Sequence, residues 1–150
     1  MIIGLTQYHT SAHIALAMLE AVCFQTREVL DAMKMDSGVS LDLLKVDGGM
    51  CVNDRLMQIQ ADLLGVDVVR PVMVETTALG SAVAAGLAVG VWEGTGDPRL
   101  ANVTMAEKTF TPVVEAADRD ARFKQWMRAV KRSIGWASDA DADEGADANM

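Results

Sequence analysis

The stretch that decides the fold covers residues 41–70 and reads LDLLKVDGGMCVNDRLMQIQADLLGVDVVR. Its first part, residues 41–47, is short, apolar and bounded by turn signals, which predicts a buried strand. A helix is expected over residues 53–64, where Gly65 ends it, and a second strand follows over residues 66–70. Strand, glycine turn, helix and strand in this order predict a βαβ unit with two parallel strands.

A long helix is expected before this unit, over residues 11–34. Ser11 is a suitable N-cap, and Gly38 lies just past the end, where glycine adopts a left-handed backbone without steric cost. Between residues 14 and 24 apolar side chains surround the helix axis. This half of the helix is therefore expected to be buried on most sides.

A second apolar helix is expected after the unit, capped by Thr76 or Thr77 and ending near Trp92. Its apolar part has only 15 residues, whereas a membrane span needs about 20. We therefore expect a buried helix and no integral membrane segment. A further strand is expected within residues 102–110.

A last helix, over residues 118–136 and capped by Asp118, combines an apolar stripe with six basic residues. The stripe consists of Phe123, Trp126, Met127, Val130 and Ile134. A basic amphipathic helix can bind membranes, partner proteins or nucleic acid. More often it packs its stripe on the domain and leaves the bases in water, and this second arrangement is the one we expect.

The composition is that of one globular domain with an acidic end. The 150 residues are 51% hydrophobic and 23% charged, which is too apolar for a disordered chain. The formal net charge is −8, but five of the 21 acidic residues lie within residues 138–150, which leaves sixteen acidic against thirteen basic residues elsewhere. This balance argues against a nucleic-acid-binding surface.

The N-terminal sequence and the cysteine content together predict a cytoplasmic protein. The first basic residue is Arg27, so the positively charged start of a secretory signal peptide is missing. Cys23 and Cys51 are too few for a disulfide framework, which favours a reducing compartment.

The most informative local feature is the turn that contains Gly48 and Gly49. It follows a predicted strand, and ligands of open α/β sheets lie beyond the carboxyl ends of the strands. Glycines there let the backbone approach a ligand closely, but the same residues also suit a plain tight turn. Asn53 is likewise read first as the N-cap of the next helix and second as a polar ligand contact.

Other residues with reactive side chains give no catalytic or metal site. His9 and His13 are four residues apart, but the motif lacks the glutamate of a zinc protease, so a helix-start role is preferred to metal binding. Cys23 lies among apolar residues and is expected in the core. Cys51 is expected to be more exposed, next to the turn, but neither histidine is near it in sequence to activate it.

Five segments carry a resemblance to a known family. They are GLT and HIALAMLE within residues 4–20, FQTREVL at 24–30, VDGGM at 46–50 followed by Asn53, ETTALG at 75–80 followed by Ala85 and Gly86, and WMRAVKRSIGW at 126–136. In this order they resemble the C-terminal part of the FGGY carbohydrate kinases. The second and last segments resemble the glycerol kinases in particular.

The resemblance implies an α/β fold, part of an actin-like ATPase (ribonuclease H-like) domain with a small βαβ unit and flanking helices. Residues 1–136 would form the C-terminal domain of such a kinase, incomplete at its N-terminus. Residues 137–150 would form a disordered acidic tail. Missing early strands would leave a sheet edge unpaired, which predicts association between copies of the chain.

By the same resemblance, the function is that of part of an ATP:glycerol 3-phosphotransferase, with a nucleotide and glycerol as partners and Mg²⁺ carried with ATP. Gly48, Gly49 and Asn53 would contact the adenosine end of the nucleotide. The general base and the metal ligands of the family belong to sequence before this chain, so no catalytic residue is expected here and the chain alone should be inactive. The alternatives are another FGGY sugar or polyol kinase, or a non-catalytic interaction module derived from one.

Overall fold

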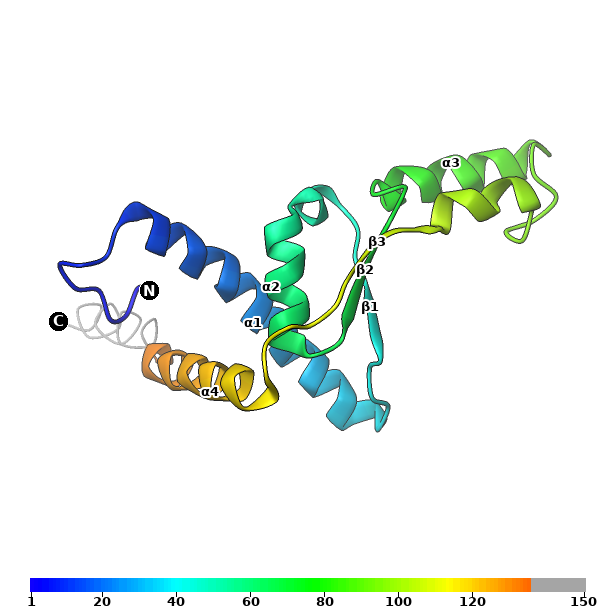
Figure 1. Cartoon of the computed structure of the whole chain (residues 1–150). Coiled ribbons are helices and arrows are strands. Elements are labelled where there is room, and N and C mark those ends of the chain that lie inside the picture. The colour runs from blue at the N-terminus through cyan, green and yellow to red at the C-terminus, as the bar shows by residue number, and fades with distance from the viewer. Residues whose placement is uncertain (136–150) are drawn as a thin grey trace, which may run out of the picture.

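The computed structural model describes residues 1–135 (Figure 1). Its elements, in chain order, are α1 (Ser11–Ser37), β1 (Leu43–Lys45), the 3₁₀ helix η1 (Gly49–Val52), α2 (Asp54–Leu64), β2 (Asp67–Pro71), α3 (Thr76–Ala88), the 3₁₀ helix η2 (Pro98–Thr104), β3 (Ala106–Phe110) and α4 (Ala116–Ser133). The expected acidic tail, residues 137–150, lies outside the described residues, as does Trp136.

The three strands form one sheet in the order β1-β2-β3. β1 and β2 are parallel, with Leu44 opposite Val68, and α2 connects them, which confirms the predicted βαβ unit. β3 adds to β2 in the antiparallel direction and places Phe110 opposite Val68. β1 is shorter than the predicted strand over residues 41–47. β2 is the central strand, because β1 and β3 pair with it on either side.

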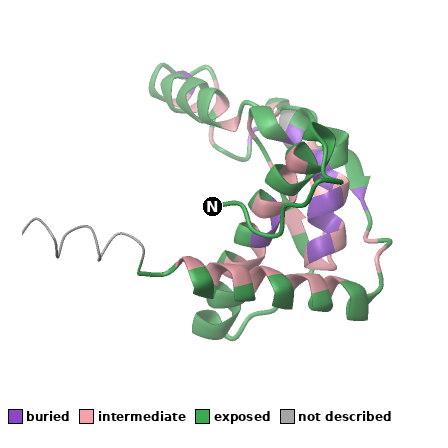
Figure 2. Cartoon of the chain, turned by 90° about the vertical axis from the view of Figure 1, so that its left-hand side faces the viewer, coloured by how far each residue is buried: buried purple, intermediate pink, exposed green. Residues whose placement is uncertain are grey.

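The core forms around α2, which contacts β2 and β3 on one side and α1 and α4 on the other (Figure 1). Most residues of α2 are at least half-buried, and the buried residues gather on it (Figure 2). The buried apolar residues are Cys23, Phe24, Cys51, Leu56, Met57, Ile59, Ala61, Leu63, Val68 and Phe110. Phe123 and Trp126 of the predicted stripe pack against this cluster, and Trp126 stacks on Phe24 with ring centroids 5.4 Å apart.

The glycine signals at two helix ends are confirmed. Gly38 has a φ of 70° and Gly65 a φ of 74°, and each donates its N–H to a carbonyl of the last turn of its helix. This left-handed geometry favours glycine because a Cβ would crowd the neighbouring backbone.

Three predicted N-caps were wrong by one to three residues. α1 begins after Thr10 and not after Ser11, because the Nδ1 atom of His13 accepts a hydrogen bond of 3.2 Å from the Thr10 N–H and so closes the first turn. α3 begins after Glu75, and the hydroxyl of Thr76 is used in a bond to Asp47. α4 begins after Glu115, because the Glu115 carbonyl already accepts the N–H of Arg119.

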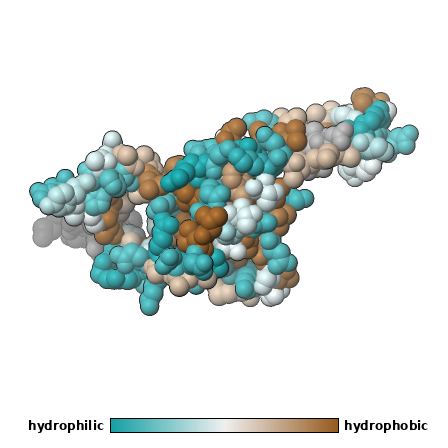
Figure 3. Space-filling view, viewed as in Figure 1, coloured by the Kyte–Doolittle hydropathy of each residue, from teal (hydrophilic) through white to brown (hydrophobic). Residues whose placement is uncertain are grey.

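The predicted burial of two apolar helix segments was also wrong. In the first half of α1, Met18 is 67% exposed and Val22 41% exposed. α3 extends away from α1 and α2 (Figure 1), ends at Ala88 before the predicted Trp92, and buries only Gly86. The described residues place no second layer on these surfaces, and apolar side chains remain visible on the face shown in Figure 3.

None of the helices within residues 1–135 is both long and apolar enough to cross a membrane.

Candidate functional site

The turn after β1 is held by backbone geometry and by two hydrogen bonds to the segment that begins α3. Gly48 has a φ of 82°, a left-handed conformation that favours glycine, and its N–H donates to the Val74 carbonyl at 2.7 Å. The hydroxyl of Thr76 donates to the carboxylate of Asp47. The residue after Gly48 therefore starts η1 at the carboxyl end of β1, where a ligand site was predicted.

Asn53 is the N-cap of α2, as predicted. Its Oδ1 accepts hydrogen bonds from the N–H groups of Arg55, at 3.0 Å, and Leu56, at 3.2 Å. Within residues 1–135 the Nδ2 group of Asn53 donates no hydrogen bond. The same side chain therefore caps the helix through its oxygen and keeps two N–H donors for a ligand.

A cavity of about 430 Å³ opens between α1, η1 and the start of α2. It is lined by Leu19, Gly49, Met50, Val52, Asn53 and Leu56. Two of the three predicted site residues, Gly49 and Asn53, thus meet at one cavity, whereas Gly48 shapes the turn and does not line it.

The sequence reasoning missed the apolar walls of this cavity. Leu19 comes from α1, far from the turn in sequence, and only its helical spacing from buried Cys23 placed it on the core side. Val52 and Leu56 lie on either side of Asn53 in the chain, and no ligand signal in the sequence marks them.

A second cluster that the sequence reasoning missed lies behind the turn, around Arg70 of β2. Arg70 pairs with Asp54 at 2.8 Å and with Glu107 at 3.1 Å, and Asp54 also pairs with Lys108 at 2.6 Å. The hydrogen bonds from Lys108 and Arg70 lower the pKa of Asp54 below its usual value. These ion pairs join Asp54, the first residue of α2, to strands β2 and β3.

We predict that Asp54→Asn makes stability less dependent on pH in the acid range. Because the folded pKa of Asp54 is lowered, its stabilising contribution is complete above the usual aspartate value of about 4 and is lost as the pH falls through the folded value. The measurement is the urea midpoint of both proteins between pH 7 and pH 2.5. The unaltered chain should be more stable at pH 7, and the difference should shrink below pH 4; a constant difference would contradict the ion pair.

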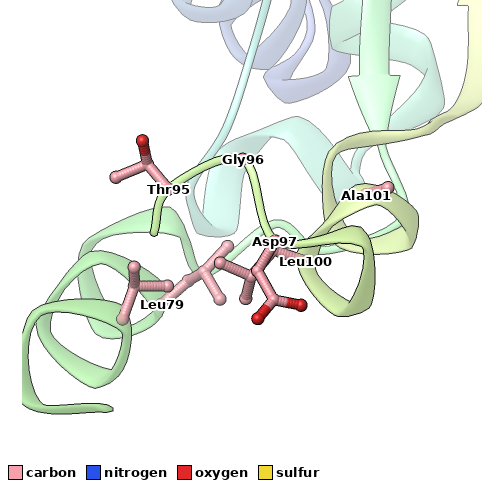
Figure 4. Close-up of a pocket in the computed structure, with 7 residues that line it drawn as sticks. Leu79, Thr95, Gly96, Asp97, Leu100 and Ala101 are labelled. Carbon is pink, nitrogen blue, oxygen red and sulfur yellow. The ribbon is translucent and has the colours of Figure 1, made fainter. Parts of the chain in front are cut away.

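Another cavity, of about 270 Å³, lies between α3 and the loop that enters η2 (Figure 4). It is lined by Leu79, Val83, Thr95, Gly96, Asp97, Leu100 and Ala101. The Asp97 carboxylate accepts hydrogen bonds from the side chain and the N–H of Arg99 and from the N–H of Glu93, which hold its pKa well below the usual range. This carboxylate is engaged by its own loop, and no predicted site residue lines the cavity, so the cavity at η1 is the stronger candidate.

The two cysteines are both buried, which corrects the expectation for Cys51. Cys23 is fully buried, and burial raises the pKa of its thiol to about 12. Cys51 is only 2% exposed, because η1 turns its side chain into the core, and burial raises its pKa as well. Buried, protonated thiols are poor nucleophiles, so neither cysteine provides a catalytic group.

The two histidines lie at the start of α1, with ring centroids 5.6 Å apart. The Nδ1 atom of each accepts a hydrogen bond from a backbone N–H, that of Thr6 for His9 and that of Thr10 for His13. Both rings therefore act in local turns. Within residues 1–135 no group of three or more His, Cys, Asp or Glu side chains could hold a metal ion.

Comparison with known proteins relates this site to a kinase family. Residues 1–89 match the model of the C-terminal domain of the FGGY family of carbohydrate kinases. A glycerol kinase of Mycolicibacterium vanbaalenii is 56% identical over 135 residues, which are 90% of this chain and 26% of that protein. A glycerol kinase of Beutenbergia cavernae is 54% identical over 138 residues, which are 92% of this chain and 27% of that protein.

Solved structures agree with the sequence relatives. The structure of Plasmodium falciparum glycerol kinase with ADP matches with a TM-score of 0.75 and 30% identity, and it covers 89% of this chain and 26% of that chain. A xylulose kinase from Rhodospirillum rubrum, with a TM-score of 0.66 and 24% identity over 86% of this chain and 26% of that chain, supports the fold alone. The expected fold, part of an actin-like ATPase domain, is thereby confirmed.

The chain spans about a quarter of the length of the relatives that it matches. The family model matches more than half of this chain, and the similarity to a glycerol kinase extends over 90% of this chain. This chain belongs to the FGGY family of carbohydrate kinases, and its residues 1–89 match the C-terminal domain of that family.

Proposed function

We propose that this chain supplies part of the nucleotide site of an ATP:glycerol phosphotransferase, and that the cavity at η1 receives the adenosine end of the nucleotide. The observation that carries the proposal is the meeting of Gly49 and Asn53 at one cavity with apolar walls. Ligand pockets are commonly apolar with a few placed polar groups, and the volume of this cavity falls in their usual range.

The chemistry of the lining favours a base or ribose over a phosphate. Leu19, Met50, Val52 and Leu56 offer apolar surface to a flat ring, and the Nδ2 group of Asn53 offers donors to its polar edge. Among residues 1–135, no lysine or arginine lines the cavity. The N–H groups of Arg55 and Leu56 are already capped by Asn53, so the start of α2 does not present these amides to a phosphate.

The phosphoryl-transfer step would need groups from other parts of a kinase. Asp47 is bonded to Thr76, and Asp54 is paired with Arg70 and Lys108, so neither carboxylate near the turn is placed as a general base. The same partners occupy the oxygens that would bind Mg²⁺, so these two carboxylates do not fit as its ligands. We therefore expect no glycerol-dependent ATP consumption by the 150-residue chain alone, and clear turnover would overturn this assignment of roles.

Glycerol as the acceptor rests on the relatives, whose names are those of glycerol kinases at 54–56% identity. We further propose a domain organisation, a mode of association and a location. Residues 1–136 would act as one C-terminal domain, followed by the acidic segment at 137–150. The outer edge of β1 has no strand beside it among the described residues, which would allow copies to associate. A cytoplasmic location would suit the two free thiols and the use of ATP.

We predict that Asn53→Ser weakens ADP binding but leaves the stability of the chain nearly unchanged. In Asn53→Ser the hydroxyl can still cap α2, since serine and asparagine are equally good N-caps, but the Nδ2 donors are lost. ADP should bind the unaltered chain weakly, with a dissociation constant on the order of 1 mM. The variant should bind roughly fivefold more weakly because one hydrogen bond is worth about 1 kcal/mol.

The measurement is a titration with ADP followed by backbone amide signals, with a urea unfolding curve for each protein. Arg55→Gln serves as the matched control, since Arg55 is also at the start of α2 but its side chain does not line the cavity. Equal ADP affinity of Asn53→Ser and the unaltered chain would remove Asn53 from the site.

A further inference from the structure

Arg70 is a buried charged residue whose guanidinium donates four hydrogen bonds. It lies in β2, is only 7% exposed, and its side chain contacts the backbone of η1. Arginine is seldom buried unless it is paired, because removing a charge from water is costly. The partners of its guanidinium therefore show what it is placed to hold.

Three of these partners lie in η1 and at the start of α2, beside the cavity. The Nη1 group donates to the carbonyl oxygens of Cys51, at 3.0 Å, and Val52, at 3.3 Å, and to the carboxylate of Asp54, at 2.8 Å. Asn53 lies between these residues in the chain, so the residues on both sides of it are tied to one guanidinium. Val52 and Asn53 both line the cavity.

The fourth partner ties the turn to the sheet. The Nε group of Arg70 donates to Glu107 of β3 at 3.1 Å, and the guanidinium carbon lies 5.7 Å from the centre of the Phe110 ring. The side chain is thereby fixed against β3 while its far end holds the turn. A planar fork of donors is needed for this arrangement, and lysine offers only a point charge.

We propose that Arg70 is a positioning residue for the nucleotide site: it sets the path of residues 51–54 and so the placement of Asn53. This inference rests on the proposed function of the cavity. It assigns to a buried residue outside the cavity a contribution to ligand affinity that is separate from its contribution to stability.

The test uses Arg70→Lys, which keeps the positive charge, with Arg128→Lys as the matched control. Arg128 is exposed on α4, and among residues 1–135 its side chain donates to Gln125 alone. Glu107→Gln is a second variant, which leaves Arg70 in place and weakens its ion pair with β3. Because the Glu107 side chain is half-exposed, this change should cost little stability. Backbone amide signals are recorded for each folded protein without ligand and during titration with ADP.

In Arg70→Lys we expect the amide signals of residues 49–53 to move before any ADP is added. ADP affinity, measured on protein that remains folded, should fall about tenfold. Glu107→Gln should give a smaller change in the same direction, and Arg128→Lys should give none.

Unchanged affinity in folded Arg70→Lys would overturn the proposal, whether or not the amide signals move, since Arg70 would then have a structural role only. The failure of the proposed function has a different signature. In that case the unaltered chain would show no ADP binding, although Arg70→Lys would still move the signals of the turn.

Discussion

Gly49→Val is expected to weaken ADP binding severely while the chain stays folded. Gly49 does not have a positive φ, and a Cβ built on it meets no atom within 4 Å, so the backbone tolerates a side chain. Because Gly49 lines the cavity of about 430 Å³, the valine side chain would occupy space that the ligand needs. We expect the loss of affinity to exceed tenfold, or about 1.4 kcal/mol.

Gly48→Ala is the matched control for this prediction. Gly48 does not line the cavity, but its φ of 82° makes alanine unfavourable by roughly 1–2 kcal/mol. The two variants should therefore differ in their effects: Gly48→Ala lowers the stability of the chain, and Gly49→Val lowers its affinity for ADP. Titration with ADP and urea unfolding of both variants measure the difference, and unimpaired ADP binding by Gly49→Val would exclude the cavity as the site.

Leu63→Ala is expected to cause the largest loss of stability. Leu63 is fully buried on α2, the helix that contacts both the sheet and the outer helices. Removing a buried leucine side chain of this kind costs about 2–5 kcal/mol, because apolar contacts are lost and a cavity remains. A chain of this size has a total stability of roughly 5–15 kcal/mol, so the variant should lose a large fraction of it.

The free energy of unfolding in urea measures this effect. Met18→Ala is the control, since Met18 is 67% exposed on α1 and its removal should change stability by less than about 0.5 kcal/mol. Equal stabilities of the two variants would contradict the placement of the core around α2.

The βαβ unit could be predicted from the sequence because its signals are local. Asn53 caps α2 through amides two and three residues away, and Gly65 ends the same helix with its own backbone. The apolar runs at residues 41–47 and 66–70 indicate strands because they are short and bounded by turn signals. The presence of Gly49 and Asn53 at one cavity follows from the same local geometry.

The rest of the site depends on contacts between distant residues. Arg70 reads as the end of a strand, and nothing in its neighbourhood in sequence announces its bonds to Cys51, Asp54 and Glu107. Leu19 reaches the cavity only because α1 packs across α2. Such contacts are set by tertiary packing, which periodicity alone does not specify.

The predicted burial of α1 and α3 was wrong for a related reason. Apolar residues around a helix, as in α3, indicate that the helix suits an apolar surrounding, but they do not show which residues provide it. Among the described residues, nothing covers the side of α1 that carries Met18 or most of α3.

Binding of the nucleotide at η1 can be observed by titrating the 150-residue chain with ADP and following the amide signals of residues 1–135. We expect the earliest and largest changes at Gly49, Asn53 and their neighbours in η1, and smaller changes at Leu19. Changes confined to α3 and η2, around the cavity that contains Asp97, or no change at any ADP concentration up to about ten times the expected dissociation constant, would contradict nucleotide binding at η1.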